Sequence, residues 1–190
     1  MRRPIAIGSS LLLALSASTI ALAQEPGADP SPSAGPEASP ISEEAIMRIT
    51  STAFEHEGDI PAQYTCDGLD ISPPLSIEDL PAGTVSLVLV MDDPDAPMGT
   101  WDHWVAYDIE PTTEIPEDVQ ELGTPGTNSW DRTGYGGPCP PRGMHRYVFA
   151  VYALDSTLDW EPGADKASVL GQIHDHVLAE ATLLGFYSRD

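Results

Sequence analysis

Two short segments of the sequence carry the residue types from which a small polar site can be built. The first, DDPDAPMGTWDHW, places Asp93 and His103 directly after an apolar run. The second, GPCPPRGMHRY, ends on His145 and Tyr147. Imidazole and phenol groups donate hydrogen bonds, and a neighbouring carboxylate can orient an imidazole ring. These residue types favour a pocket that binds a small anion, in which a histidine takes up a proton.

Two strands are expected to bring the first pair of side chains together. Residues 84–91 are β-branched and apolar on both faces, which predicts a central strand. HWVAYDIEP, residues 103–111, predicts the next strand. Sequential strands often pair with each other, so an antiparallel pair would put Asp93 and His103 at one edge of the sheet.

A third strand is predicted for HRYVFAVYAL, residues 145–154. Side chains alternate along a strand, so His145, Tyr147, Phe149 and Val151 face one side. His145 and Tyr147 can therefore join Asp93 and His103 at the end of the sheet.

The remaining pattern predicts a mostly β domain with a large central sheet and one C-terminal helix. Residues 47–54 alternate between apolar and polar and indicate a half-buried strand. Residues 164–184 place Val169, Ile173, Val177 and Ala181 at helical spacing, which predicts a helix across the whole segment.

The N-terminal part of the chain has a different character. Residues 1–23 combine two arginines, an apolar stretch and an Ala-x-Ala ending, the pattern of a cleaved secretory signal. Residues 24–42, rich in Pro, Ser and Ala, predict a flexible tether. Residues 43–190 form the folded domain. The expected location is therefore periplasmic or secreted.

The composition is strongly acidic. The formal net charge is −22, and removal of residues 1–23 takes away two arginines and no acid, which leaves about −24. Such a chain should repel nucleic acid and anionic membrane surfaces. Arg132, Arg142 and Arg146 could supply a local positive rim. Arg146 alternates away from His145, so a structural hydrogen bond is favoured for it.

Cys66 and Cys139 are the two cysteines of the chain. In an exported protein a pair of cysteines usually forms a disulfide, which is the interpretation we favour. Two free buried thiols are the alternative.

The segments DPDAP and GPCPPRGMHRY, with His103 between them, closely resemble the signatures of the phosphatidylethanolamine-binding protein family, in its bacterial Raf kinase inhibitor-like branch. The resemblance covers about residues 48–189. It implies a large sheet with a small anion-binding cavity that accepts phosphate-like groups. By position, the cavity residues would be Asp93, His103, Pro138, His145 and Tyr147, with Gly137 lending its backbone.

These observations predict an exported binding protein for a small anionic or phosphate-bearing ligand, with no cofactor and no enzymatic activity. The resemblance also suggests a protein partner, such as a kinase or a protease, that the domain would inhibit. The expected compartment makes a cytoplasmic kinase implausible.

Two other functions stay open at this point. Asp93, Asp95, His103 and His145 could bind a metal ion in a metal-dependent hydrolase, because carboxylate and imidazole suit zinc or manganese. Alternatively, the domain is a secreted interaction module whose pocket is a relic. Trp101 and Trp104 either form a wall of the pocket or pack in the core.

Overall fold

The computed structural model of the chain describes residues 46–190. The predicted signal peptide and tether, residues 1–23 and 24–42, lie outside the described residues. Within residues 46–190, no helix combines the length and the apolar character needed to cross a membrane.

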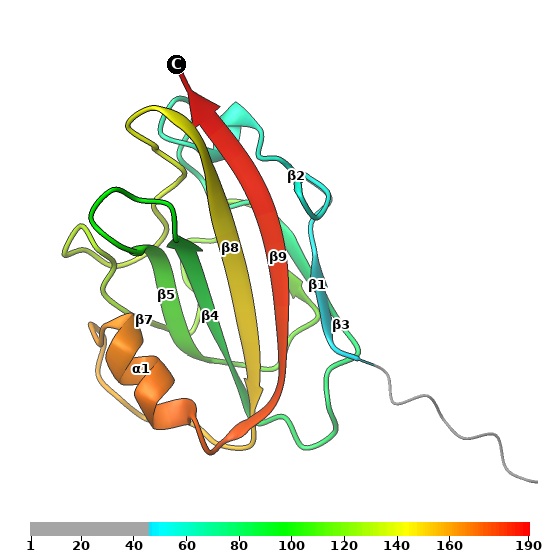
Figure 1. Cartoon of the computed structure of the whole chain (residues 1–190). Coiled ribbons are helices and arrows are strands. Elements are labelled where there is room, and N and C mark those ends of the chain that lie inside the picture. The colour runs from blue at the N-terminus through cyan, green and yellow to red at the C-terminus, as the bar shows by residue number, and fades with distance from the viewer. Residues whose placement is uncertain (1–45) are drawn as a thin grey trace, which may run out of the picture. The chain divides into compact units, whose positions relative to one another are not determined.

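The described chain is dominated by a six-stranded sheet with the order β2-β9-β8-β4-β5-β7 (Figure 1). Its strands are β2 (Gly58–Asp59), β4 (Ser86–Asp93), β5 (Trp101–Ile109), β7 (Thr124–Pro125), β8 (Gly143–Leu154) and β9 (Val177–Arg189). A three-stranded sheet has the order β1-β3-β6, with β1 (Arg48–Thr50), β3 (Leu75–Glu78) and β6 (Glu114–Ile115). A short 3-10 turn, η1, covers Ala62–Tyr64, and the helix α1 covers Lys166–Ile173.

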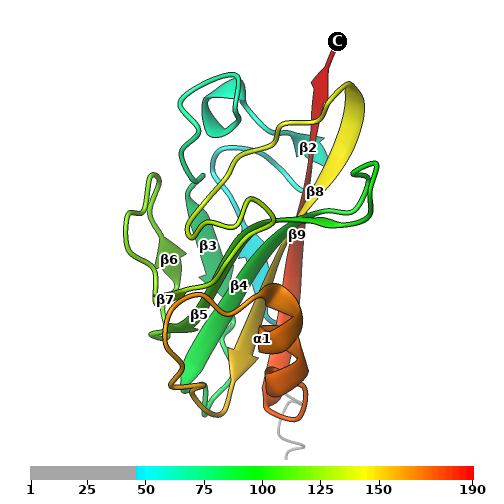
Figure 2. The ribbon, with the colours of Figure 1, turned by 90° about the vertical axis from the view of Figure 1, so that its left-hand side faces the viewer.

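The large sheet is covered on both faces, because β4 is apolar on both sides. Leu87, Leu89 and Met91 pack in the cluster that includes β1 and β3, whereas Val88 and Val90 pack in the cluster that includes α1. Figure 2 shows the small sheet and α1 on opposite sides of the large sheet. The prediction of a buried central strand at residues 84–91 is therefore confirmed.

The antiparallel pairing that the site needs is also confirmed. β4 pairs with β5, with Asp93 opposite Trp101, and β4 pairs with β8 on its other edge. The connection from β4 to β5 and the segment that leads into β8 lie at the same end of the sheet (Figure 1). Asp93, His103 and His145 are consequently neighbours in the fold.

The predicted helix over residues 164–184 is wrong in its second half. α1 ends at Ile173, and from Val177 the chain forms β9, which pairs with β8 from Gly143 to Leu154. The last strand of the domain is therefore β9, which the sequence pattern did not predict. One helix near the C-terminus of a mostly β domain is confirmed.

Candidate functional site

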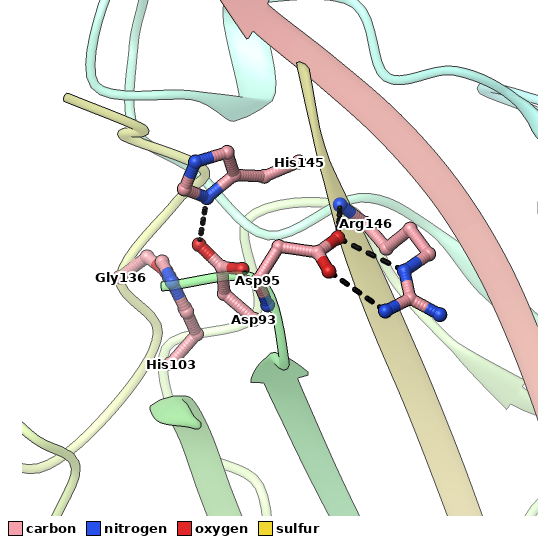
Figure 3. A network of polar contacts seen from close by, with 6 residues as sticks. All are labelled: Asp93, Asp95, His103, Gly136, His145 and Arg146. Carbon is pink, nitrogen blue, oxygen red and sulfur yellow. Dashed lines mark hydrogen bonds and ion pairs between the residues drawn. The ribbon is translucent and has the colours of Figure 1, made fainter. Parts of the chain in front are cut away.

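Asp93 and His145 form the most buried polar pair of the candidate site. The His145 Nδ1 lies 2.7 Å from Asp93 Oδ2, and the two residues are 8% and 3% exposed. A carboxylate accepts, so Nδ1 must carry the proton of this hydrogen bond. Figure 3 shows Asp93 pointing toward His145. The prediction that Asp93 orients one imidazole agrees with this geometry.

His103 is held by the backbone instead. Its Nδ1 lies 2.7 Å from the carbonyl oxygen of Gly136, so Nδ1 donates, and Gly136 N in turn donates to the His103 carbonyl at 3.1 Å. Burial lowers the pKa of His103 from its ordinary value of 6.5, against opposing effects of Gly136 and Asp93. His103 is therefore neutral at pH 7, with its unshared electron pair on Nε2.

Tyr147 belongs to β8 and lies behind the ring of His103. Its ring meets the His103 ring edge to face, with the centroids 5.3 Å apart, and its side chain is fully buried. Burial and the Asp93 carboxylate raise the pKa of Tyr147, so the phenol keeps its proton. Within residues 46–190 this hydroxyl makes no hydrogen bond of good geometry, although the Asp93 carboxylate and the Cys139 backbone lie beside it.

A cavity of about 230 Å³ opens in front of Asp93 and His103. Its walls include Pro97, Trp101 and Trp130. The Trp130 ring meets both Trp101 and His103 edge to face, with centroids 5.4 Å and 4.9 Å apart.

The two tryptophans of the first motif therefore differ in position. Trp101 lines the cavity, whereas Trp104 is 3% exposed and belongs to the core. His145 and Tyr147 do not line the cavity itself: they contact the two residues that do, Asp93 and His103.

Trp130 was missed by the sequence reasoning, and so was the residue that positions it. Asn128 is 3% exposed, and its Oδ1 accepts from Trp130 N at 3.0 Å and from Arg132 N at 3.4 Å. Its Nδ2 donates to the carbonyl of Gly134 at 3.2 Å. An asparagine two residues before the tryptophan is the signature of such a turn, and it was the available signal.

The expected role of Gly137 as a backbone donor to the anion needs correction. Its N–H already donates to Asp70 Oδ1 at 2.7 Å. A side chain at this position would come within 2.4 Å of the Tyr64 carbonyl oxygen, so the glycine permits close packing of two segments. Pro138 is buried, and its carbonyl accepts from Cys66 N at 3.2 Å.

The same two segments are joined covalently. Cys66 and Cys139 form a disulfide, as predicted, and Cys139 lines the cavity. The bridge and the hydrogen bonds of Gly137 and Pro138 hold the wall of the cavity against the segment that follows η1.

Asp95 does not join the polar cluster. Both of its carboxylate oxygens bind the Arg146 guanidinium, at 2.9 and 2.7 Å, and Figure 3 shows it turned away from Asp93. Arg146 lowers the pKa of Asp95 to about 2. The structural role favoured for Arg146 agrees with this contact, although its partner is a carboxylate rather than a carbonyl.

This arrangement does not support the metal-dependent hydrolase. Asp95, one of its four proposed ligands, is bound to Arg146, and residues 46–190 contain no group of three or more His, Cys, Asp or Glu side chains placed to hold a metal ion.

Of the remaining arginines of the expected rim, Arg132 lies over the Trp130 ring, 5.1 Å from its centroid.

The pKa of His103 leads to a testable result. We expect NMR titration of the histidine ring signals to give His103 a pKa below 6.5, with the proton on Nδ1 at pH 7. As the pH falls, His103 is protonated in the unfolded chain first, near pH 6.5. The stability that the neutral His103 gives to the folded state is therefore complete above that pH. It is lost as the pH falls through the lower, folded pKa. Urea unfolding between pH 7 and pH 5 measures this loss, and His103→Gln should reduce it. A His103 pKa above 6.5 would contradict the assignment.

The fold and the site together define a class of protein: a sheet domain with a small, partly apolar cavity at one end of its strands and buried imidazole, phenol and carboxylate groups beside it. Comparisons with known proteins agree. The family model of the phosphatidylethanolamine-binding protein matches residues 50–188. This chain belongs to that family, as the sequence motifs indicated.

Relatives in bacteria and archaea are similar over most of their length. A UPF0098 protein of Methanothermobacter thermautotrophicus is 49% identical over 150 residues, which cover 75% of this chain and 99% of the relative. A UPF0098 protein of Pyrococcus horikoshii is 46% identical over 157 residues, covering 77% and 79% of the two chains.

Two crystal structures have a similar fold. The phosphatidylethanolamine-binding protein homolog CT736 of Chlamydia trachomatis has a TM-score of 0.74 at 41% identity, covering 76% of this chain and 99% of the other. YbcL of E. coli, described as a new member of the mammalian family, has a TM-score of 0.72 at 27% identity, covering 77% and 100%.

Proposed function

We propose that this protein is an exported binding protein whose cavity takes a small oxyanion, such as a phosphate group. One observation carries the proposal. In residues 46–190, the buried side-chain polar atoms without a hydrogen-bond partner are Trp101 Nε1 and Tyr147 Oη. Trp101 lines the cavity, and Tyr147 lies directly behind His103, which also lines it. An unpaired buried donor costs about 1–3 kcal/mol, so a site that holds two of them is best explained by a ligand that accepts from them.

The shape of the cavity supports a small ligand. About 230 Å³ is below the usual range for a drug-sized molecule, and the tryptophan and proline walls limit the access of water. A hydrogen bond is stronger in such an apolar setting than in water.

The disulfide supports export. Disulfides are stable in oxidising compartments such as the periplasm, and the Cys66–Cys139 bridge is part of the wall of the cavity. This agrees with the secretory signal predicted for residues 1–23.

The Tyr147 hydroxyl provides a direct test. We expect Tyr147→Phe to weaken the binding of inorganic phosphate by about 10- to 100-fold, the value of one hydrogen bond to a charged acceptor. The free energy of unfolding should stay the same or rise slightly, because the removed hydroxyl has no partner. Isothermal titration calorimetry and urea unfolding measure the two quantities.

Tyr107→Phe is the matched control. Tyr107 is equally buried, but its hydroxyl donates to the Glu161 carbonyl at 2.6 Å, in the cluster that includes α1. This variant should lose about 1 kcal/mol of stability and bind phosphate like the wild type. The proposal fails if Tyr147→Phe keeps the wild-type affinity, or if the wild type binds no phosphate.

A further inference from the structure

We infer that the first half of β9 is a docking edge at which an extended segment of a partner protein adds a strand to the large sheet. The segment has aliphatic and basic side chains in alternation. The docking edge runs from Leu178 to Thr182, at the end of β9 that pairs with the last residues of β8. Asp93 and the cavity lie toward the opposite end of β8, so the docking edge is separate from the candidate site.

The two edges of the large sheet are protected to different extents. β7 closes one edge beside β5 and contains Pro125, a residue that cannot donate a backbone hydrogen bond to another strand. On the other edge, β2 pairs with β9 at Gly185 and Phe186 (Figure 1). Since β9 begins at Val177, a long part of its outer edge precedes this pairing. Unpaired N–H and C=O groups on such an edge are a template for another strand.

The backbone groups of Glu180 and Thr182 point outward from this edge. Leu184 marks the direction, because its N–H donates to His56 Nδ1 at 3.3 Å and its carbonyl accepts from Glu57 N at 2.7 Å. Outward and inward residues alternate along an antiparallel strand, and the pairing with β8 is regular from residue 179 to residue 189. Glu180 and Thr182 therefore present their N–H and C=O groups outward as well. Within residues 46–190 these groups form no hydrogen bond on that side.

A hollow lies on each face of the sheet beside the docking edge. The hollow on the side of the small sheet has a volume of about 800 Å³, and the one on the side of α1 has about 260 Å³. Glu180 lines both, because it stands on the edge between them. Side chains of an added strand alternate between the two faces, so each hollow receives every second side chain. Peptides that add to a sheet edge gain affinity from backbone hydrogen bonds and specificity from such side-chain pockets.

The hollow on the side of the small sheet favours aliphatic side chains. Two of its apolar residues are well exposed, Ile46 at 76% and Leu178 at 42%. The carboxylate of Asp79 also lines this hollow, but Arg48 binds it at 3.0 Å. The apolar lining consists of Ile46, Met47, Leu80, Pro81, Ala82, Leu178 and Ala179.

The hollow on the side of α1 favours a basic side chain with a long stem. Ala181 is buried toward the small sheet, so the neighbouring Glu180 faces α1, opposite Tyr152 of β8. The ion pairs within residues 46–190 leave Glu180 without a cation. A lysine or arginine in this hollow lays its methylene stem along the apolar wall and brings its charge to Glu180. The rest of the lining consists of Tyr152, Leu170, Ile173, His174 and Val177.

Charge and composition argue against two other occupants. Residues 24–42 of the same chain contain five prolines and three acids and no lysine or arginine, so they match neither the backbone nor the charge of the docking edge. A second copy would bring its own Glu180 to the same edge, and the net charge of −22 on each chain opposes self-association. A basic segment of a different protein meets both requirements.

Calorimetric titration of the wild-type protein with the peptide acetyl-Val-Lys-Val-Lys-Val-Lys-amide, in about 0.15 M salt, tests the inference. We expect binding with a Kd below about 1 mM, and slower amide hydrogen exchange at Glu180 and Thr182, because their N–H groups gain acceptors. The same peptide with all of its backbone nitrogens methylated keeps its charges and side chains but cannot donate. It should bind at least about tenfold more weakly. The inference is overturned if the first peptide does not bind, or if the methylated peptide binds equally well.

Three variants separate the docking edge from general attraction to an acidic protein. Glu180→Lys and Thr182→Pro should each weaken binding of the peptide at least about tenfold, the first by charge repulsion and the second by loss of an outward N–H. Proline is tolerated at such an edge position, and thermal unfolding checks that the variant is folded. Glu121→Lys is the matched control, since Glu121 is exposed and lies beside β5 and β7, at the other edge of the sheet. It should bind the peptide within about twofold of the wild type.

Two results would contradict the assignment of the partner. Equal losses in Glu180→Lys and Glu121→Lys would show that the peptide is held by net charge alone. Sedimentation velocity of the wild-type protein should give a monomer. A dimer that Glu180→Lys or Thr182→Pro dissociates would show that a second copy covers the docking edge. Phosphate binding in the cavity is measured separately in the same variants and should stay unchanged, so the failure of this inference leaves the proposed function standing.

Discussion

Replacing Cys66 and Cys139 together with alanine is expected to lower the free energy of unfolding by roughly 4 kcal/mol. The two residues are 73 positions apart, and the chain-entropy treatment of a loop of that length gives a stabilisation of this size. The effect should come mainly from the unfolded chain. In the folded domain the Cys66 N–H still donates to the Pro138 carbonyl, and Gly137 N still donates to Asp70, so the two segments stay together.

Urea unfolding of the oxidised wild type and of the double variant measures this difference. Wild-type protein in excess thiol reductant is the matched control, and it should unfold like the double variant. Denaturing thiol titration of the untreated protein should find no free thiol. A stability difference below about 1 kcal/mol would mean that the bridge does not constrain the unfolded chain.

Much of the sheet could be predicted from sequence because burial of both faces leaves a clear pattern. Residues 87–91 are apolar at every position, and the structure buries all of them. Alternation in β8 correctly placed His145 and Tyr147 on one face, since both are buried and Arg146 between them is exposed. These patterns depend only on local chain geometry, which the sequence contains.

The C-terminal segment shows where local pattern fails. Val169 and Ile173 are buried at helical spacing in α1, and Ala181 continued that spacing by coincidence. In the structure Ala181 and Leu183 are buried at strand spacing, and Val177 is 37% exposed. Pairing with the whole length of β8 decides the structure of β9, and no local preference of alanine and leucine reveals a partner strand.

The site was predictable in its side chains and not in its backbone contacts. Motif spacing brought Asp93, His103 and His145 together correctly. It could not show that the Gly136 carbonyl fixes the proton of His103, or that the Gly137 amide is bound to Asp70. Those contacts join segments that are more than thirty residues apart in the sequence, and they determine which atoms are left for a ligand.

Asp93→Ala is expected to lower the free energy of unfolding by about 3 kcal/mol. The substitution leaves the buried His145 Nδ1–H and the Asp95 N–H without acceptors, and each such loss costs about 1–3 kcal/mol. Burial is the reason for the size of the effect, because water cannot replace the lost carboxylate: the two side chains of the pair are 9% and 5% exposed.

A second pair in the same domain isolates the role of burial. His176 Nδ1 lies 2.8 Å from Asp155 Oδ1, nearly the distance found in the first pair, but these side chains are 44% and 51% exposed. Asp155→Ala should therefore cost less than about 1 kcal/mol, because water solvates the freed imidazole. Urea unfolding of both variants, at a pH where the wild type is stable, gives the comparison. Equal losses in the two variants would mean that the Asp93–His145 pair is solvated like a surface pair, and the cavity would then lack the dry, ordered wall that anion binding needs.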